Sequence, residues 1–129
     1  MARKALPRPT DVELAILRVL WERGPSSVRD VHNALLENRD TGYSTTLKMM
    51  QVMFDKGLLR RDESRRPQVY APATPEEQTQ KQIVDDLVQK VFGGSARKLV
   101  LRAVQSENVT SQELAEIRRL IKQLEGGRQ

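Results

Sequence analysis

The sequence predicts a mainly α-helical fold with one small β-hairpin, and three observations support this prediction. Apolar residues recur at helical spacing through most of the 129-residue chain. Two short strand-like runs flank a charged turn between residues 58 and 71. Pro72 and Pro75 then interrupt the chain, and the composition changes after them. We therefore expect a flexible basic arm over 1–9, one domain over 10–72 and a helical domain over 73–129.

The first predicted helix begins at a capping box. The Thr10 hydroxyl can accept a hydrogen bond from the Glu13 amide while the Glu13 side chain reaches back to the Thr10 amide. The helix places Leu14, Leu17 and Trp21 on one face and ends at Gly24-Pro25. Further apolar residues widen this stripe, namely Val12, Ile16, Val19 and Leu20. This pattern predicts an amphipathic helix packed on a core.

A second and a third helix follow with a short polar turn between them. Ser26 or Ser27 caps the second helix, which runs to about Leu36 with Val28, Val31 and Leu35 facing the core. Residues 38–42 form the turn, and the third helix spans 43–56 and stops at Gly57. This order is typical of a helix-turn-helix.

The third helix has two different faces. Leu47, Met50, Met53 and Phe54 form an apolar stripe, and the opposite face has no carboxylate before Asp55 in the last turn. That face carries Thr45, Lys48, Met49 and Val52, with Ser44 and Gln51 at its margin. Phosphates repel carboxylates, and base edges accept hydrogen bonds from hydroxyl, ammonium and amide groups. The pattern therefore predicts a recognition helix in a DNA groove.

Some residues of this helix have two interpretations. Ser44 could instead be the N-cap of an ordinary solvated helix, and Met49 and Val52 either touch thymine methyl groups or are merely exposed. Thr46 lies nearer the buried side, where packing and helix-start hydrogen bonds would be its main contribution.

The two strand-like runs, 58–61 and 68–71, predict a β-hairpin, which after a helix-turn-helix is the wing of a winged helix. Arg60, Arg61, Arg65 and Arg66 lie in its first strand and tip, within reach of a phosphate backbone. Because side chains alternate along a strand, only one of Arg60 and Arg61 should face DNA, and the sequence leaves open which. The predicted DNA-binding residues are Ser44, Thr45, Thr46, Lys48, Gln51, Arg65 and Arg66.

Three amphipathic helices are predicted after residue 75, and the last of them begins at a second capping box, Thr110 with Glu113. In so short a segment their apolar stripes cannot readily bury one another, so we expect them to pack against a second copy of the chain. Docking to another protein or to a membrane surface is the alternative, although carboxylates such as Glu76 and Asp85 disfavour a membrane. The predicted dimerisation residues are Leu87, Val91, Leu99, Val100, Leu114, Ile117, Leu120 and Ile121.

Composition excludes several classes of function. The chain has no cysteine, so disulfides and thiolate sites are excluded, and its single histidine, His32, is expected to be solvated. Residues 1–72 carry 13 Lys and Arg against 9 Asp and Glu, whereas residues 73–129 carry 9 against 8. We find no catalytic constellation and expect neither an enzyme nor a cofactor or metal. The sequence has no secretory signal and no apolar run long enough to span a membrane, so we expect a cytoplasmic, nucleoid-associated protein without membrane insertion.

Several segments resemble the penicillinase repressors of the BlaI/MecI family. The most specific likeness is Tyr43-Ser44-Thr45-Thr46, followed by Lys56-Gly57-Leu58 and Val69-Tyr70. The remaining similar segments are Leu14, Val19-Leu20-Trp21, Ser27-Val28-Arg29-Asp30-Val31, Met50-Gln51, Glu113-Leu114 and Ile117-Arg118. The resemblance implies a homodimer of winged helices that binds a palindromic double-stranded DNA operator and represses transcription.

The resemblance also implies a sensor protease as a partner. Protease-regulated members are cut at an Asn-Phe pair, where the similar positions of this chain read Arg102-Ala103. The cysteines of the copper-responsive branch are absent here. The function predicted is therefore a dimeric repressor that occupies its operator with a recognition helix and a basic wing. The alternative is a winged-helix protein-interaction module without sequence-specific DNA binding.

Overall fold

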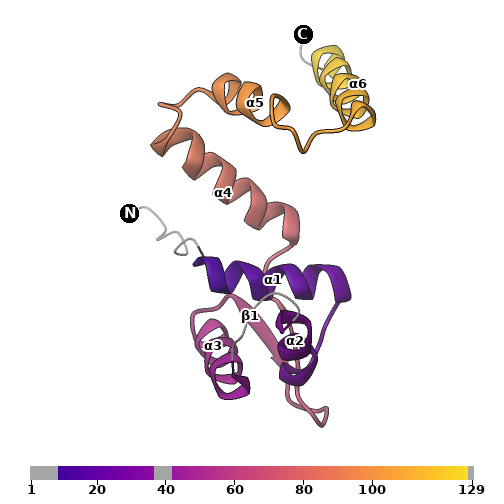
Figure 1. The fold of residues 1–129 in the computed structure, drawn as a ribbon. Coiled ribbons are helices and arrows are strands. Elements are labelled where there is room, and N and C mark those ends of the chain that lie inside the picture. Colours follow the sequence, from indigo (N-terminus) through magenta and orange to yellow (C-terminus); the bar gives the residue numbers. More distant parts are fainter. Residues whose placement is uncertain (1–8, 37–41, 128–129) are drawn as a thin grey trace. The chain divides into compact units, whose positions relative to one another are not determined.

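The computed structural model describes residues 9–36 and 42–127 (Figure 1). Over these residues the chain is mainly helical, with six helices and a two-stranded antiparallel sheet, as predicted. It divides into two compact units, 1–83 and 84–129. The predicted domain boundary at residue 73 stays a prediction. The predicted basic arm, apart from Pro9, and the turn before Gly42 lie outside the described residues.

Helix α1 (Asp11–Arg23) begins at the predicted capping box. The Glu13 amide donates to the Thr10 hydroxyl over 3.2 Å, and the Thr10 amide donates to Glu13 Oε1 over 2.9 Å. Its most buried apolar residues are Ile16, Leu17 and Leu20, while Leu14 and Trp21 are only half-buried. The most buried residues therefore lie within the predicted stripe, and its centre is nearer Ile16 and Leu20 than Leu14 and Trp21.

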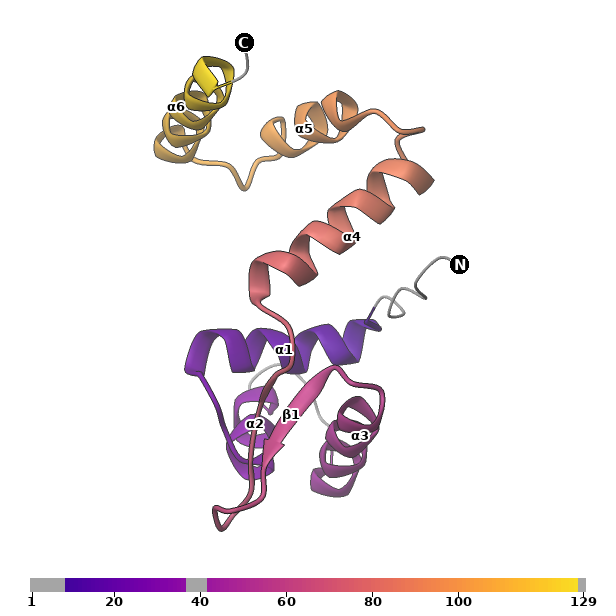
Figure 2. The same ribbon diagram turned by 180° about the vertical axis from the view of Figure 1, so that it is seen from behind.

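Helices α2 (Val28–Leu35) and α3 (Tyr43–Asp55) complete the helical part of the first core. Ser27, not Ser26, caps α2, and its hydroxyl accepts from the Asp30 amide. Both helices supply fully or nearly fully buried side chains to one cluster with α1, namely Val28, Val31, Leu35, Met50 and Met53. In both views α1 lies across one end of α2 and α3 (Figures 1 and 2).

The hairpin consists of β1 (Leu59–Asp62) and β2 (Val69–Pro72), each one residue later than predicted. Leu59 pairs with Pro72, and Arg61 pairs with Tyr70. Ser26 adds an antiparallel bridge to Tyr70, with N–H···O distances of 3.0 and 2.8 Å, which explains why it is not the cap of α2. Leu59 and Tyr70 are buried, so the base of the hairpin is part of the core.

The helices after the hairpin are α4 (Glu76–Lys90), which begins in the first unit, α5 (Ala96–Val104) and α6 (Ser111–Gly127). The predicted capping box is present at the start of α6, where the Glu113 amide donates to the Thr110 hydroxyl over 3.1 Å. Neither α5 nor α6 has a buried residue. Within the described ranges, no helix is long and apolar enough to cross a membrane.

Candidate nucleic-acid interface

The exposed face of α3 carries most of the predicted recognition residues. Ser44, Thr45, Lys48 and Gln51 are exposed, as is Val52, while Met49 is half-buried against the core. The first turn of α3 has no acidic residue, and Gly42 precedes it as N-cap, so Ser44 is free of a capping role. The helix and the tip of the hairpin lie on the side of the first unit away from α1 (Figures 1 and 2). One extended ligand can therefore meet both.

Thr46 is not part of this exposed face. Its side chain is 1% exposed, and its hydroxyl lies 3.1 Å from Nδ1 of His32 and 3.5 Å from the carbonyl oxygen of Gly42. The structure therefore places Thr46 behind the recognition face, between α2 and α3.

The prediction that His32 is solvated is wrong, because its side chain is only 7% exposed. His32 follows Val28 by one helical turn, so it lies on the face of α2 that meets α3. The edge of its ring contacts the Tyr43 ring, with 5.5 Å between centroids, and the Arg29 guanidinium lies 4.3 Å from the Tyr43 centroid. The first turn of α3 is thus attached to α2 by polar and aromatic contacts, which fix where the exposed face of α3 points.

The other end of α3 is attached to α1 by an ion pair. Lys56 Nζ lies 2.8 Å from Glu13 Oε2, and the Glu13 side chain is 2% exposed against 41% for Lys56. Burial alone would raise the pKa of the Glu13 carboxyl, but hydrogen bonds from Lys56 and Thr10 and the charge of Lys56 outweigh it. They hold this pKa below its ordinary value of 4.5. The same carboxylate therefore caps α1 and anchors the end of α3.

Replacing Lys56 with methionine should lower the free energy of unfolding at neutral pH by about 1–2 kcal/mol, because it leaves a buried carboxylate without its cation. This loss is smaller than the ~3–5 kcal/mol lost when one partner of a fully buried ion pair is removed, since water can reach the position of the half-exposed Lys56. Glu13 has a lowered pKa in the folded state, so its contribution is complete above about pH 4.5 and is lost as the pH falls through the folded-state pKa. The difference in free energy of unfolding between the unmodified protein and the Lys56→Met variant should therefore shrink in acid.

Urea unfolding of both proteins between pH 3 and pH 7 measures this difference. The double variant Glu13→Gln/Lys56→Met is the control, since glutamine keeps the capping box but removes the unpaired charge. A stability loss that does not depend on pH would contradict the ion-pair explanation.

The arginines of the hairpin differ in their surroundings. Arg60, Arg65 and Arg66 are exposed, whereas Arg61 is half-buried. The Arg61 guanidinium lies 4.0 Å from the Phe54 ring centroid, and its Nε donates to Glu63 Oε1 over 2.9 Å. At the tip, the amide and hydroxyl of Ser64 both donate to Asp62, and these bonds hold the pKa of the Asp62 carboxyl below its ordinary value.

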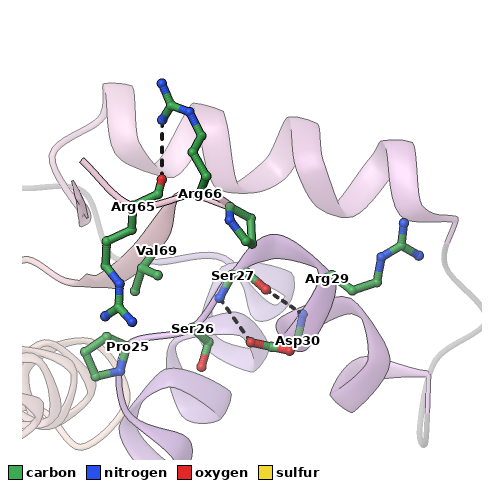
Figure 3. Close-up of a pocket in the computed structure, with 9 residues that line it drawn as sticks. Pro25, Ser26, Ser27, Arg29, Asp30, Arg65, Arg66 and Val69 are labelled. Carbon is green, nitrogen blue, oxygen red and sulfur yellow. Dashed lines mark hydrogen bonds between the residues drawn. The ribbon is translucent and has the colours of Figure 1, made fainter. Parts of the chain in front are cut away.

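A surface depression of about 610 Å³ lies between the start of α2 and the tip of the hairpin. Figure 3 shows that its arginines do not converge: Arg65 points toward Pro25, while Arg66 and Arg29 extend away in other directions. Asp30 is turned toward Ser27, whose amide donates to the carboxylate over 3.4 Å. A site for one compact anion would need converging donors, so this surface fits an extended polyanion better.

The predicted dimerisation residues lie on or beside α4, α5 and α6. Leu87, Leu99 and Ile117 are half-buried. The others are large apolar side chains that are more than a third exposed, namely Val91, Val100, Leu114, Leu120 and Ile121.

Comparison with known proteins gives the family. The sequence model of the penicillinase repressor family matches residues 9–123. The chain belongs to the penicillinase repressor family. It is 34% identical over 124 residues to the transcriptional regulator BlaI of Mycobacterium tuberculosis, covering 95% of this chain and 88% of that protein. It is 20% identical to the penicillinase repressor of Bacillus licheniformis, covering 93% and 94%, and 19% identical to the methicillin resistance regulatory protein MecI of Staphylococcus aureus, covering 87% and 91%.

Membership of the penicillinase repressor family confirms the resemblance seen in the sequence. The family and these relatives are named as transcriptional regulators and repressors, not as enzymes. Among solved structures, a MarR family protein from Bacillus stearothermophilus matches with a TM-score of 0.51 at 17% identity, covering 94% of this chain and 76% of that one. This match supports the winged helix-turn-helix fold.

Proposed function

We propose that this penicillinase repressor family protein is a dimeric transcriptional repressor that occupies a palindromic DNA operator. The observation that carries the proposal is the exposed face of α3, where hydroxyl, amide and ammonium groups stand without a carboxylate in the first turn. Both ends of that helix are fixed, by His32 and Tyr43 at its start and by the Lys56–Glu13 pair at its end. A recognition helix needs such fixed ends, because base contacts require the helix to hold one position in the groove.

In this proposal α3 enters the major groove. The side chains that meet base edges are Ser44, Thr45, Lys48 and Gln51. Lysine can donate hydrogen bonds to guanine, and glutamine can form a pair of hydrogen bonds with adenine. Arg65 and Arg66 at the hairpin tip meet phosphates, which position the protein without reading sequence. Thr46 acts from behind by holding α3 against α2.

The dimer is supported by the exposed apolar residues of the second unit. Leu120 is 55% exposed, Ile121 45% and Leu124 49%, and they follow one side of α6. A contiguous apolar stripe on a helix surface is unfavourable in water, and a second identical copy buries it in a closed, two-fold arrangement. Such a dimer presents two recognition helices, which is why the operator should be an inverted repeat.

Selection from a library of random DNA duplexes tests this function. The protein should enrich an inverted repeat whose half-sites lie about one helical turn apart, or a multiple of it. Enrichment of a single unrepeated site would contradict the dimeric mode of binding. Recovery of no preferred sequence would favour a winged helix that binds protein partners instead.

A further inference from the structure

Arg61 is a basic residue on the wing, yet its surroundings differ from those of the other wing arginines. Its side chain is 20% exposed and lies between Phe54 at the end of α3 and Glu63 in the turn of the hairpin. The guanidinium stacks on Phe54 at 4.0 Å from the ring centroid and lies 6.0 Å from the centroid of Tyr70, its partner across the hairpin. Both Nε and one terminal nitrogen donate to the same oxygen of Glu63.

The donors of Arg61 that face Glu63 are therefore engaged within the protein. Hydrogen bonding to Tyr70 and then to Glu63 raises the pKa of the guanidinium above its ordinary value, so its charge is retained. Glu63 sits on the wing itself, where a carboxylate would repel a DNA backbone unless a nearby cation neutralised it. Arg61 supplies that neutralisation and leaves the exposed Arg65 and Arg66 as the cations of the tip.

The contacts of Arg61 also join two elements. Phe54 belongs to the last turn of α3, Arg61 to β1, and Glu63 to the turn of the hairpin. A planar guanidinium can stack on an aromatic ring and bond a carboxylate in its plane at once, which an ammonium cannot do. We propose that Arg61, held between Phe54 and Glu63, is a positioning residue that fixes the wing against the recognition helix and makes no phosphate contact itself. This inference rests on the proposed function and deepens it, and it makes Arg61 the strand arginine that is withdrawn from DNA.

The first arm of the test uses no DNA. Amide hydrogen exchange over residues 60–66 should become at least threefold faster in Arg61→Lys, which loses the stack on Phe54, and in Glu63→Ala, which releases the guanidinium that holds this stack. Glu63 is exposed, so its replacement leaves the core intact. Arg65→Ala is the matched control and should leave exchange at β1 unchanged. Equal exchange in all four proteins would overturn the proposal.

The second arm measures affinity for the selected operator at several salt concentrations. Arg61→Lys and Arg61→Ala should each bind roughly three- to tenfold more weakly, with the salt slope of the unmodified protein. Arg65→Ala should instead reduce that slope by about one, as expected when one phosphate contact is removed. A slope reduced by about one in Arg61→Ala would show a direct phosphate contact. Full affinity in Arg61→Lys would show that a positive charge is enough at this position and that the planar guanidinium is not needed. Either result would overturn the proposal.

The two arms separate this inference from the proposed function. If the unmodified protein binds no DNA with sequence preference, the repressor proposal fails, and the exchange measurement still decides whether Arg61 holds the wing. If binding is normal and exchange is unchanged, only the role of Arg61 is wrong.

Discussion

Replacing Lys48 with alanine should weaken operator binding by roughly tenfold to a hundredfold, equivalent to about 1–3 kcal/mol for one good base contact. Lys48 is exposed at the centre of the recognition face, one turn after Ser44 and one turn before Gln51 and Val52, so its loss removes a donor without disturbing the core. Binding to a scrambled duplex should change much less, since a base contact contributes to discrimination and a phosphate contact does not. Fluorescence anisotropy against both duplexes measures the two effects separately.

Lys122→Ala is the matched control for this experiment. It removes the same charge from an exposed position in α6, far along the chain from the recognition helix, and should leave both affinities nearly unchanged. Equal losses for Lys48→Ala on operator and scrambled DNA would make Lys48 a phosphate contact. No loss on either duplex would mean that this face of α3 does not meet DNA.

Replacing Leu120 with aspartate should convert the proposed dimer to monomers and weaken operator binding by about a hundredfold or more. The substitution places two like charges in the proposed two-fold interface, where burial without a partner is strongly unfavourable. A monomer engages one half-site, so it loses the gain of roughly 10²–10⁴ that linked binding provides. Sedimentation velocity gives the oligomeric state, and the anisotropy titration gives the affinity.

Ala115→Asp introduces the same charge on the opposite side of α6 and serves as the control. Ala115 is exposed, and at about 100° per residue it lies roughly opposite Ile117 and Leu120. This variant should remain dimeric. If Leu120→Asp also remains dimeric, the interface lies elsewhere.

Local signals in the sequence predicted the elements of this fold well. The Thr10–Glu13 and Thr110–Glu113 capping boxes mark the starts of α1 and α6, and both are present. The observed strands differ from the predicted ones by one residue, because the strand-like runs and the charged turn are contiguous in the chain. Exposure of Lys48 and Gln51 followed from helical spacing alone.

The contacts that fix the recognition helix were not predictable in this way. Glu13 and Lys56 are 43 positions apart, and His32 and Thr46 are 14 apart, so no local pattern links them. The burial of His32 was not predicted, because its partners Tyr43 and Thr46 belong to the next helix. Its spacing of four from Val28 was the one available signal. The sequence likewise does not distinguish the surroundings of Arg61 from those of Arg60, because the contact of Arg61 with Phe54 appears only in the folded structure.

As a repressor, this protein must bind its operator DNA with sequence preference. The most direct measurement is an anisotropy titration of the purified protein against its own upstream DNA and a scrambled duplex of equal length, at several salt concentrations. The predicted result is a preference of about a thousandfold or more for the native duplex, with affinity that falls steeply as salt rises. Equal affinities for the two duplexes would contradict the claim and leave only a basic surface that binds polyanions.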